Sequence, residues 1–324
     1  MRLLIVRLSA MGDIIHALPL AENARRAGAA VGWVAERHFA GLLEGHPGIE
    51  RVFVASTRTW RGAPFAAATR AEVAALRREA RAFSAGAVLD AQSNWKSSVL
   101  SRVVRGRARV VGLAARRRVE PVSAILCDTP VAPGPDVVHV TDEALSLLDP
   151  LGIPVSSRAP DASHLLGGSR PSPAADAFLA AQRRPFVMLH PGAGRADKCW
   201  GEERLAHVAR GLIREREIAP FVSWGPGDER RAERLRALLP KAPPLPALDF
   251  AGLARVVREC ALFVAGDTGP LHLADALGVK TLALYGPTDP ARNGPYRFRD
   301  GIVRDMRSVS DDTVLQLALR LIES

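Results

Sequence analysis

Short apolar segments alternate with longer amphipathic segments from the first residues of the chain onward. The apolar segments have the length of buried strands, and the segments between them repeat their apolar positions at helical spacing. In the first half, strands are predicted at residues 3–8, 31–35, 51–55, 87–90 and 110–112, with helices at 14–26, 68–83 and 96–104. A strand, a helix and a second strand in this order form a right-handed parallel unit, so this half predicts a Rossmann-like sheet.

The pattern breaks at residues 154–173, where proline, serine, glycine and aspartate dominate and a linker or a long connection is expected. It restarts with predicted strands at 186–190, 220–224, 262–265 and 281–285 and helices at 202–214, 228–239, 253–260 and 273–277. We therefore expect an α/β protein with two parallel-sheet domains, residues 1–165 and 166–324. The final helix, 311–322, is expected to pack against one domain or to bridge both, for example by packing back on the N-terminal domain.

The charge balance of the chain favours acidic partners. The 324 residues include 44 lysines and arginines against 34 acidic residues, a net charge of +10. This excess suits nucleic acid, an anionic membrane surface or a phosphorylated substrate. Aromatic residues make up 5% of the chain and supply few platforms for stacking bases, so we expect no nucleic-acid partner.

The cysteines and the apolar runs indicate where the protein works. Cys127, Cys199 and Cys260 are widely spaced and form no Cys-x-x-Cys pair, which favours a reduced compartment and no cysteine-built zinc site. No apolar run approaches the roughly 20 residues that a spanning helix needs, and the chain opens on a predicted strand that does not have the form of a signal peptide. We expect a cytoplasmic protein that at most attaches to a membrane surface.

Candidate chemistry lies in the loops that directly follow predicted strands, because ligands of open parallel sheets collect beyond the carboxyl ends of the strands. One such loop reads Gly266-Asp267-Thr268-Gly269-Pro270-Leu271-His272 and runs into a helix. Its glycines allow close approach to the backbone, and the first N–H groups of the helix carry the positive end of the helix dipole. The loop therefore predicts a phosphate cradle. Taken alone, such a turn is more often an ordinary connection capped by Asp267 or Thr268.

A second loop, residues 190–200, combines glycines with cations. Gly192 and Gly194 expose backbone N–H groups, and Arg195 and Lys198 add donors that match phosphate oxygens. Lys198 is a candidate for neutralising a departing diphosphate without a metal, the alternative being an ordinary surface lysine. Trp200 is expected to be a buried anchor after the loop.

The loop after the first predicted strand, residues 7–16, places Gly12 and Asp13 at the mouth of the sheet. A carboxylate in this position suits a general base. It suits the N-terminal cap of the following helix equally well, and the loop by itself does not separate the two roles.

Several common ligand-binding motifs do not occur in the sequence. Gly-x-Gly-x-x-Gly is missing at the first turn, where Gly12 stands alone, and neither Gly-Lys-Ser/Thr nor His-Glu-x-x-His occurs. These absences disfavour the usual form of dinucleotide binding, a P-loop and a zinc-protease site.

Taken together, the loops resemble the bacterial lipopolysaccharide heptosyltransferases of glycosyltransferase family 9, with the closest match to the heptosyltransferase I branch. The resemblance extends over almost the whole chain in the order found in the family. It rests on residues 3–7 with 11–19, Thr59-Trp60-Arg61, Leu89-Asp90-Ala91-Gln92 with Lys96-Ser97, His190-Pro191 through Lys198 and Trp200, Trp224-Gly225, and residues 266–274.

The resemblance implies a GT-B fold, in which two facing Rossmann-like domains bind the acceptor with the first and the nucleotide sugar with the second. It implies transfer of L-glycero-D-manno-heptose from ADP-heptose to the Kdo unit of the lipid A inner core, with inversion and without a metal or another cofactor. The lipid A-Kdo acceptor is held in a membrane. A basic protein of this kind is therefore expected to sit peripherally on the anionic cytoplasmic face of the inner membrane.

By position, the resemblance also implies roles for individual residues. Asp13 corresponds to the catalytic base and Lys198 to the residue that holds the diphosphate. The other implied donor-binding residues are Ala193, Gly194, Arg195, Gly266, Asp267, Thr268, Gly269 and His272. The implied acceptor-binding residues are Ser9, Met11, Gly12, Arg58, Arg61, Lys96, Arg116, Arg117 and Arg118.

Two other functions stay open at this point. A family 9 heptosyltransferase acting on another core sugar shares the donor loops and differs at its acceptor. A non-catalytic, basic nucleotide- or RNA-binding protein uses its arginines on phosphates. Salt-sensitive RNA binding without an ADP-dependent thermal shift would favour this last alternative.

Overall fold

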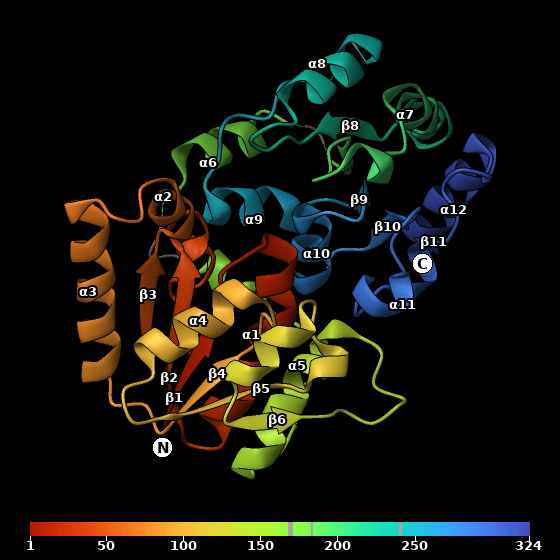
Figure 1. Ribbon diagram of the computed structural model, residues 1–324. Coiled ribbons are helices and arrows are strands. Elements are labelled where there is room, and N and C mark those ends of the chain that lie inside the picture. The colour runs from red at the N-terminus through yellow and green to blue at the C-terminus, as the bar shows by residue number, and fades with distance from the viewer. Residues whose placement is uncertain (168–170, 183, 240–241) are drawn as a thin grey trace. The chain divides into compact units, whose positions relative to one another are not determined.

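The computed structural model describes residues 1–167, 171–182, 184–239 and 242–324. The chain divides into two compact units, Met1–His164 and Leu165–Ser324, each built around one parallel sheet (Figure 1). This division falls one residue before the expected domain boundary. In the described part of the chain, every helix is too short or too polar to cross a membrane.

The sheet of the first unit has six parallel strands in the order β3-β2-β1-β4-β5-β6. They are β1 (Arg2–Val6), β2 (Ala30–Glu36), β3 (Arg51–Ala55), β4 (Ala87–Asp90), β5 (Arg109–Leu113) and β6 (Thr129–Val131). The first five are the predicted strands, whereas β6 is short, contains Pro130 and is not indicated by the apolar pattern. The strand order reverses between β1 and β4, which is where open parallel sheets bind ligands.

The helices of the first unit use their apolar positions to cover this sheet. They are α1 (Met11–Arg26), α2 (Thr57–Gly62), α3 (Ala67–Ala82), α4 (Trp95–Val104) and α5 (Val140–Leu145). On one face, Leu76 of α3 and Leu100 of α4 join Leu4, Val6 and Val88 of the strands in a buried core. α1 packs beside α5 (Figure 1). The helices α1, α3 and α4 are the predicted ones, whereas α2 and α5 are additional.

The start of the expected linker, residues 154–173, is an ordered part of the first unit. The side-chain oxygen of Asn23 on α1 accepts hydrogen bonds from the backbone N–H groups of Ser156 and Ser157 at 2.7 and 3.0 Å. The composition of this segment predicts irregular structure correctly, but it does not reveal these contacts. Residues 168–170 of the expected linker lie outside the described residues.

The second unit contains a five-stranded parallel sheet in the order β11-β10-β9-β7-β8. Its strands are β7 (Phe186–His190), β8 (Ala219–Val222), β9 (Leu262–Gly266), β10 (Thr281–Leu284) and β11 (Ile302–Val303). Its helices are α6 (Pro173–Ala180), α7 (Glu202–Arg216), α8 (Glu229–Leu238), α9 (Phe250–Arg258), α10 (Gly269–Ala276), α11 (Pro290–Asn293) and α12 (Asp311–Glu323). All the predicted elements are present, and β11, α6 and α11 are additional.

The final helix, α12, packs on α7 within the second unit (Figure 1). Val314 and Leu315 share a buried core with Leu205 and Leu212 of α7. Gly211 allows this close approach, because a Cβ atom at that position would lie 2.3 Å from the Leu315 side chain. The final helix therefore packs on the second domain, on α7.

Arg118 belongs to the interior of the first unit. Its guanidinium pairs with Asp90 at the end of β4, and both side chains are fully shielded from solvent. It also donates to the Ser123 hydroxyl at 2.8 Å and to the carbonyl oxygen of Leu113 at 3.1 Å. An acceptor cannot reach these N–H groups, so the expectation that Arg118 binds the acceptor is wrong.

The buried carboxylate of Asp90 is also held from α4. Ser97 and Ser98 each donate a hydroxyl hydrogen bond to it at 2.6 Å. Buried charges are tolerated when they are paired and hydrogen-bonded, and breaking such a pair leaves an uncompensated charge in the interior. The pair therefore ties the end of β4 to α4 and to the segment after β5.

We expect Arg118→Met to destabilise the protein by about 3–5 kcal/mol, because it leaves the Asp90 carboxylate buried without its cation. Arg116→Gln is the matched control: it removes a neighbouring exposed arginine, and its effect should stay within about 0.5 kcal/mol. Urea unfolding followed by circular dichroism measures both. Equal stability of the two variants would contradict a structural role for Arg118.

Candidate active site

The candidate site of the second unit is built from the carboxyl ends of neighbouring strands. β7 lies beside β9 and β9 beside β10, all parallel, so the segments that follow them leave the same edge of the sheet. These segments are residues 191–200, 267–268 and 285–289. The strand order explains why residues distant in the sequence meet at one place.

Lys198, Asp267 and His272 form a connected set at this edge. The Nζ of Lys198 lies 2.7 Å from one carboxylate oxygen of Asp267, and the Nε2 of His272 lies 3.3 Å from the other. The side chains of Lys198 and Asp267 are 20% and 10% exposed, so the pair is largely buried but a ligand can still reach it. The structure thus brings together three residues that the sequence analysis placed in a donor site.

Asp267 is held in its ionised form by its partners. Burial by itself would raise the pKa of this carboxyl, but the hydrogen bonds and charges of His272 and Lys198 outweigh burial and hold the pKa well below its usual range. A permanent carboxylate fixes the position of the Lys198 ammonium. An ammonium has three N–H donors, so Lys198 keeps donors for an anionic ligand beyond the one that it gives to Asp267.

The start of α10 adds a backbone donor and the positive end of a helix dipole beside this set. Thr268 is the N-cap residue and adopts an extended conformation, and its hydroxyl makes no capping hydrogen bond to the first turn of this helix. Gly269 and Pro270 follow as the first helical residues. Pro270 has no N–H, and the Leu271 N–H bonds to the carbonyl oxygen of Thr268 at 3.1 Å. The first turn therefore offers an anion the N–H of Gly269 together with the positive end of the helix dipole. This turn is therefore not a connection capped by the Thr268 side chain, and its geometry is compatible with an anion.

Gly266 lets the two segments approach closely. A Cβ atom at Gly266 would lie 2.3 Å from the carbonyl oxygen of Lys198, a distance that real Cβ atoms do not show. The end of β9 consequently packs directly on the backbone that carries the lysine. The role of this glycine is close packing of two segments.

The other residues of the loop after β7 differ in how far they are buried. Arg195 is exposed and pairs with Asp197, so it does not join the buried set. Ala193 is half-buried, whereas Gly194 is exposed and has open space where a Cβ would stand. Trp200 is buried and donates its Nε1 hydrogen bond to the carbonyl oxygen of Met306 at 2.8 Å, which confirms its expected role as an anchor.

Behind this loop, His190, Ser223 and Asp228 form a group of polar contacts that the sequence does not indicate. The Nδ1 of His190 lies 2.9 Å from the Ser223 hydroxyl, and its Nε2 lies 3.5 Å from Asp228. The Asp228 carboxylate also fills the space beside Gly192, where a Cβ would lie 2.0 Å from it. Gly192 is buried and serves packing, so the expectation that it exposes its backbone is wrong. The pairing of β7 with β8 brings these residues together, and no short motif encodes it.

In the first unit, Asp13 takes the capping role that its sequence allows and also presents a carboxylate to solvent. It lies in the first turn of α1, where one carboxylate oxygen accepts the backbone N–H of Ala10 at 3.0 Å. The other oxygen lies 2.7 Å from the guanidinium of Arg7. The side chain is still 47% exposed, so a carboxylate of fixed orientation faces solvent.

The expected acceptor residues fall into exposed and buried groups. Arg58 and Arg61 are exposed on α2, Lys96 is exposed in the first turn of α4, and Arg116 is exposed. Arg117 is half-buried and lies 3.3 Å from Glu143, so its charge is engaged. Around the start of α1, Ser9 is half-buried, whereas Met11 and Gly12 are buried in the first turn. The Nζ of Lys96 lies 3.6 Å from Glu36, so its charge is also engaged. The exposed arginines of this set are Arg58, Arg61 and Arg116.

Comparison with known proteins identifies the family of the chain. The chain matches the family described as glycosyltransferase family 9 (heptosyltransferase) over residues 73–318. Lipopolysaccharide heptosyltransferase 1 of Pseudomonas aeruginosa is similar, with 35% identity over 303 residues that cover 91% of this chain and 81% of that protein.

Solved heptosyltransferase structures are similar to this chain over its whole length. Escherichia coli heptosyltransferase WaaC with ADP is similar at a TM-score of 0.81 and 29% identity, covering 99% of this chain and 100% of that one. WaaC with ADP-2-deoxy-2-fluoro heptose gives a TM-score of 0.79 and 28% identity, with 99% of each chain covered. The two parallel-sheet units therefore have the GT-B fold. The chain belongs to glycosyltransferase family 9, the heptosyltransferases.

Proposed function

We propose that this protein transfers L-glycero-D-manno-heptose from ADP-heptose to the Kdo unit of the lipid A inner core, with inversion and without a metal. The single observation that carries the proposal is the Lys198–Asp267–His272 set beside the uncapped start of α10. The relatives named for lipopolysaccharide heptose transfer, and WaaC with ADP and with a fluorinated ADP-heptose, support this choice of substrates.

The second unit holds the donor and stabilises the leaving group. Breaking the bond between the anomeric carbon and the diphosphate leaves negative charge on ADP. Lys198 and the Gly269 N–H at the start of α10 meet this charge as fixed donors in a partly shielded site. In the proposal these groups supply the positive charge that a metal ion supplies in other transferases.

The first unit supplies the base. Asp13 removes the proton from an acceptor hydroxyl while that oxygen bonds to the anomeric carbon and ADP leaves from the opposite face, which inverts the configuration. Its contacts with Arg7 and Ala10 orient the carboxylate, and its exposure leaves it accessible to a substrate. A base in a suitable position contributes about 10²–10⁴ in rate.

The open cations of the first unit suit an acidic acceptor. Kdo carries a carboxylate, and the exposed Arg58, Arg61 and Arg116 present guanidinium donors for it. Lys96 has further N–H donors beside its ion pair with Glu36. Because that acceptor is anchored in a bilayer, we further propose that the protein works peripherally on the cytoplasmic face of the inner membrane. The net charge of +10 supports attraction to an anionic leaflet.

Incubation with ADP-heptose and Kdo-lipid A, followed by mass spectrometry, tests the proposed reaction. We expect a product heavier than the acceptor by one heptose residue, formed at the same rate with and without EDTA. Transfer only to an acceptor that already carries heptose would assign the protein to another core sugar. A requirement for a divalent metal would contradict the role given to Lys198.

Replacing Asp13 by asparagine separates its two roles. The amide oxygen of Asp13→Asn still accepts the Ala10 N–H, so the start of α1 is preserved, but the amide cannot take a proton. We expect turnover to fall by about 10²–10⁴ while ADP affinity stays within about twofold. Single-turnover kinetics and calorimetric titration with ADP measure the two effects. A rate near that of the wild type would show that Asp13 is a cap and not the base.

A further inference from the structure

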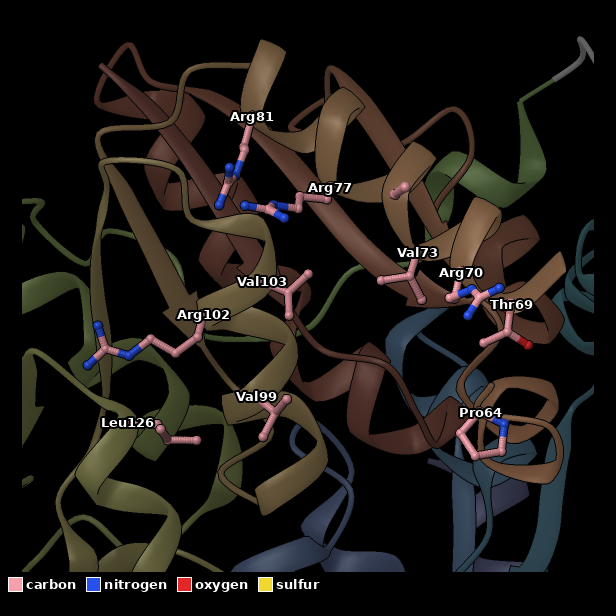
Figure 2. A pocket seen from close by; sticks show the side chains of 11 residues that line it. Pro64, Thr69, Arg70, Val73, Arg77, Arg81, Val99, Arg102, Val103 and Leu126 are labelled. Carbon is pink, nitrogen blue, oxygen red and sulfur yellow. The ribbon is translucent and has the colours of Figure 1, made fainter. Parts of the chain in front are cut away.

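A groove runs between α3 and α4 on the first unit, apart from the residues given to catalysis (Figure 2). Its volume is about 650 Å³. Arginines of α3 line one side, and the floor and the other side are mainly aliphatic. The main lining residues are Arg70, Arg77 and Arg81 on α3, Val99 and Val103 on α4, and Leu126.

Three of the four arginines of α3 line the groove, and among the described residues no acidic partner offsets their charges. The acids of this helix are turned to other neighbours, because Glu79 pairs with Arg51 at 2.9 Å and Glu72 accepts the Nε1 hydrogen bond of a tryptophan at the same distance. Within the residues that the structure describes, no carboxylate lies within ion-pair distance of Arg70, Arg77 or Arg81. In Figure 2, the side chains of Arg77 and Arg81 extend from α3 over the groove.

The remaining arginine of the groove behaves differently. Arg102 on α4 points away from α3 and pairs with Asp128 at 2.8 Å (Figure 2). Asp128 is also shared with Arg105 at 2.8 Å. The excess positive charge of the groove is therefore concentrated on the α3 side.

Large apolar side chains stand exposed next in the chain to residues that line the groove. Phe65, which follows the lining residue Pro64, is 86% exposed, and Ile125, which precedes Leu126, is 69% exposed. Val122 is 68% exposed and lies in the same short helical segment as Ile125. Exposed apolar residues that neighbour a basic groove in the chain are typical of an interaction surface.

We propose that this groove docks the protein on an anionic phospholipid membrane. Arg70, Arg77 and Arg81 bind lipid phosphates, while Phe65, Val122 and Ile125 enter the boundary between head groups and acyl chains. Guanidinium groups match phosphate oxygens, and exposed apolar side chains gain by leaving water at that boundary. The biological purpose assigned to this surface rests on the proposed function, because a lipid-linked acceptor lies in such a membrane.

The lining favours a membrane over nucleic acid. The side chains between the arginines and Leu126 are valines and alanine, which offer no flat ring for a base to stack on. The groove is also continuous along the chain with the expected acceptor cations, since Arg58 and Arg61 lie on α2 directly before Pro64. A membrane bound at the groove thus lies near the part of this unit to which we assign the acceptor.

Sedimentation with lipid vesicles tests the proposal without any enzymatic readout. The probes are vesicles of phosphatidylglycerol mixed with phosphatidylcholine and vesicles of phosphatidylcholine alone, both at low salt. We expect the full-length wild type to bind the mixed vesicles and not the neutral ones. Combined Arg70→Gln, Arg77→Gln and Arg81→Gln should weaken binding roughly 100-fold, because each cation near an anionic surface contributes roughly fivefold.

A variant with the same loss of charge provides the control. Arg78, Arg258 and Arg320 are exposed and lie outside the groove, and their combined replacement by glutamine should leave most of the vesicle binding intact. Phe65→Ser with Ile125→Ser should weaken binding in a way that persists at high salt, because it removes the apolar contribution. Equal losses in the two arginine variants would overturn the proposal. Stronger binding of the groove to RNA than to the mixed vesicles would also overturn it.

Heptose transfer to an acceptor dispersed in neutral detergent separates this inference from the proposed function. The groove variant should keep its rate within about twofold of the wild type. Absence of transfer by the wild type would refute the proposed function and leave the vesicle result standing. Unchanged vesicle binding by the groove variant would refute the docking groove and leave the transfer reaction standing.

Discussion

The ion pair between Lys198 and Asp267 is the contact on which the candidate donor site depends. It joins the loop after β7 to the turn after β9, so two segments far apart in the chain share one fixed geometry. The partial burial of the pair strengthens its attraction, because the local dielectric constant is lower than that of water. The contact requires Gly266, since any side chain there would push the backbone of Lys198 away. The parallel sheet thus places the residues, and the ion pair fixes them.

A related arrangement recurs in the first unit, where the cation–carboxylate pair of Arg7 and Asp13 follows the end of β1. In both units a carboxylate at the carboxyl edge of a parallel sheet is fixed by a neighbouring cation. The two differ in exposure, because Asp267 is mostly buried whereas about half of Asp13 faces solvent. The burial of Asp267 suits a residue that positions Lys198. The exposure of Asp13 suits the proton acceptor that we propose.

Much of the fold could be predicted because buried parallel strands are short apolar runs. The predicted strands at 51–55, 87–90 and 186–190 agree with the observed bounds. β6 and α5 were not predicted because both are too short to show a clear hydrophobic period. β6 is a three-residue edge strand that contains Pro130, and α5 has six residues. Arg118 shows a different limit. Its place in a run of three arginines was expected to put it in the acceptor site, but its burial depends on Asp90, which lies 28 positions earlier in the chain.

The coupling between Lys198 and Asp267 in ADP binding tests the central claim most directly. Calorimetric titration of ADP into the wild type, Lys198→Ala, Asp267→Asn and the double variant forms a complete cycle. If Asp267 acts by positioning Lys198, the double variant should bind ADP about as weakly as Lys198→Ala alone, with a coupling energy of about 1–3 kcal/mol. Additive losses in the double variant would show that the two residues act independently and would contradict the account.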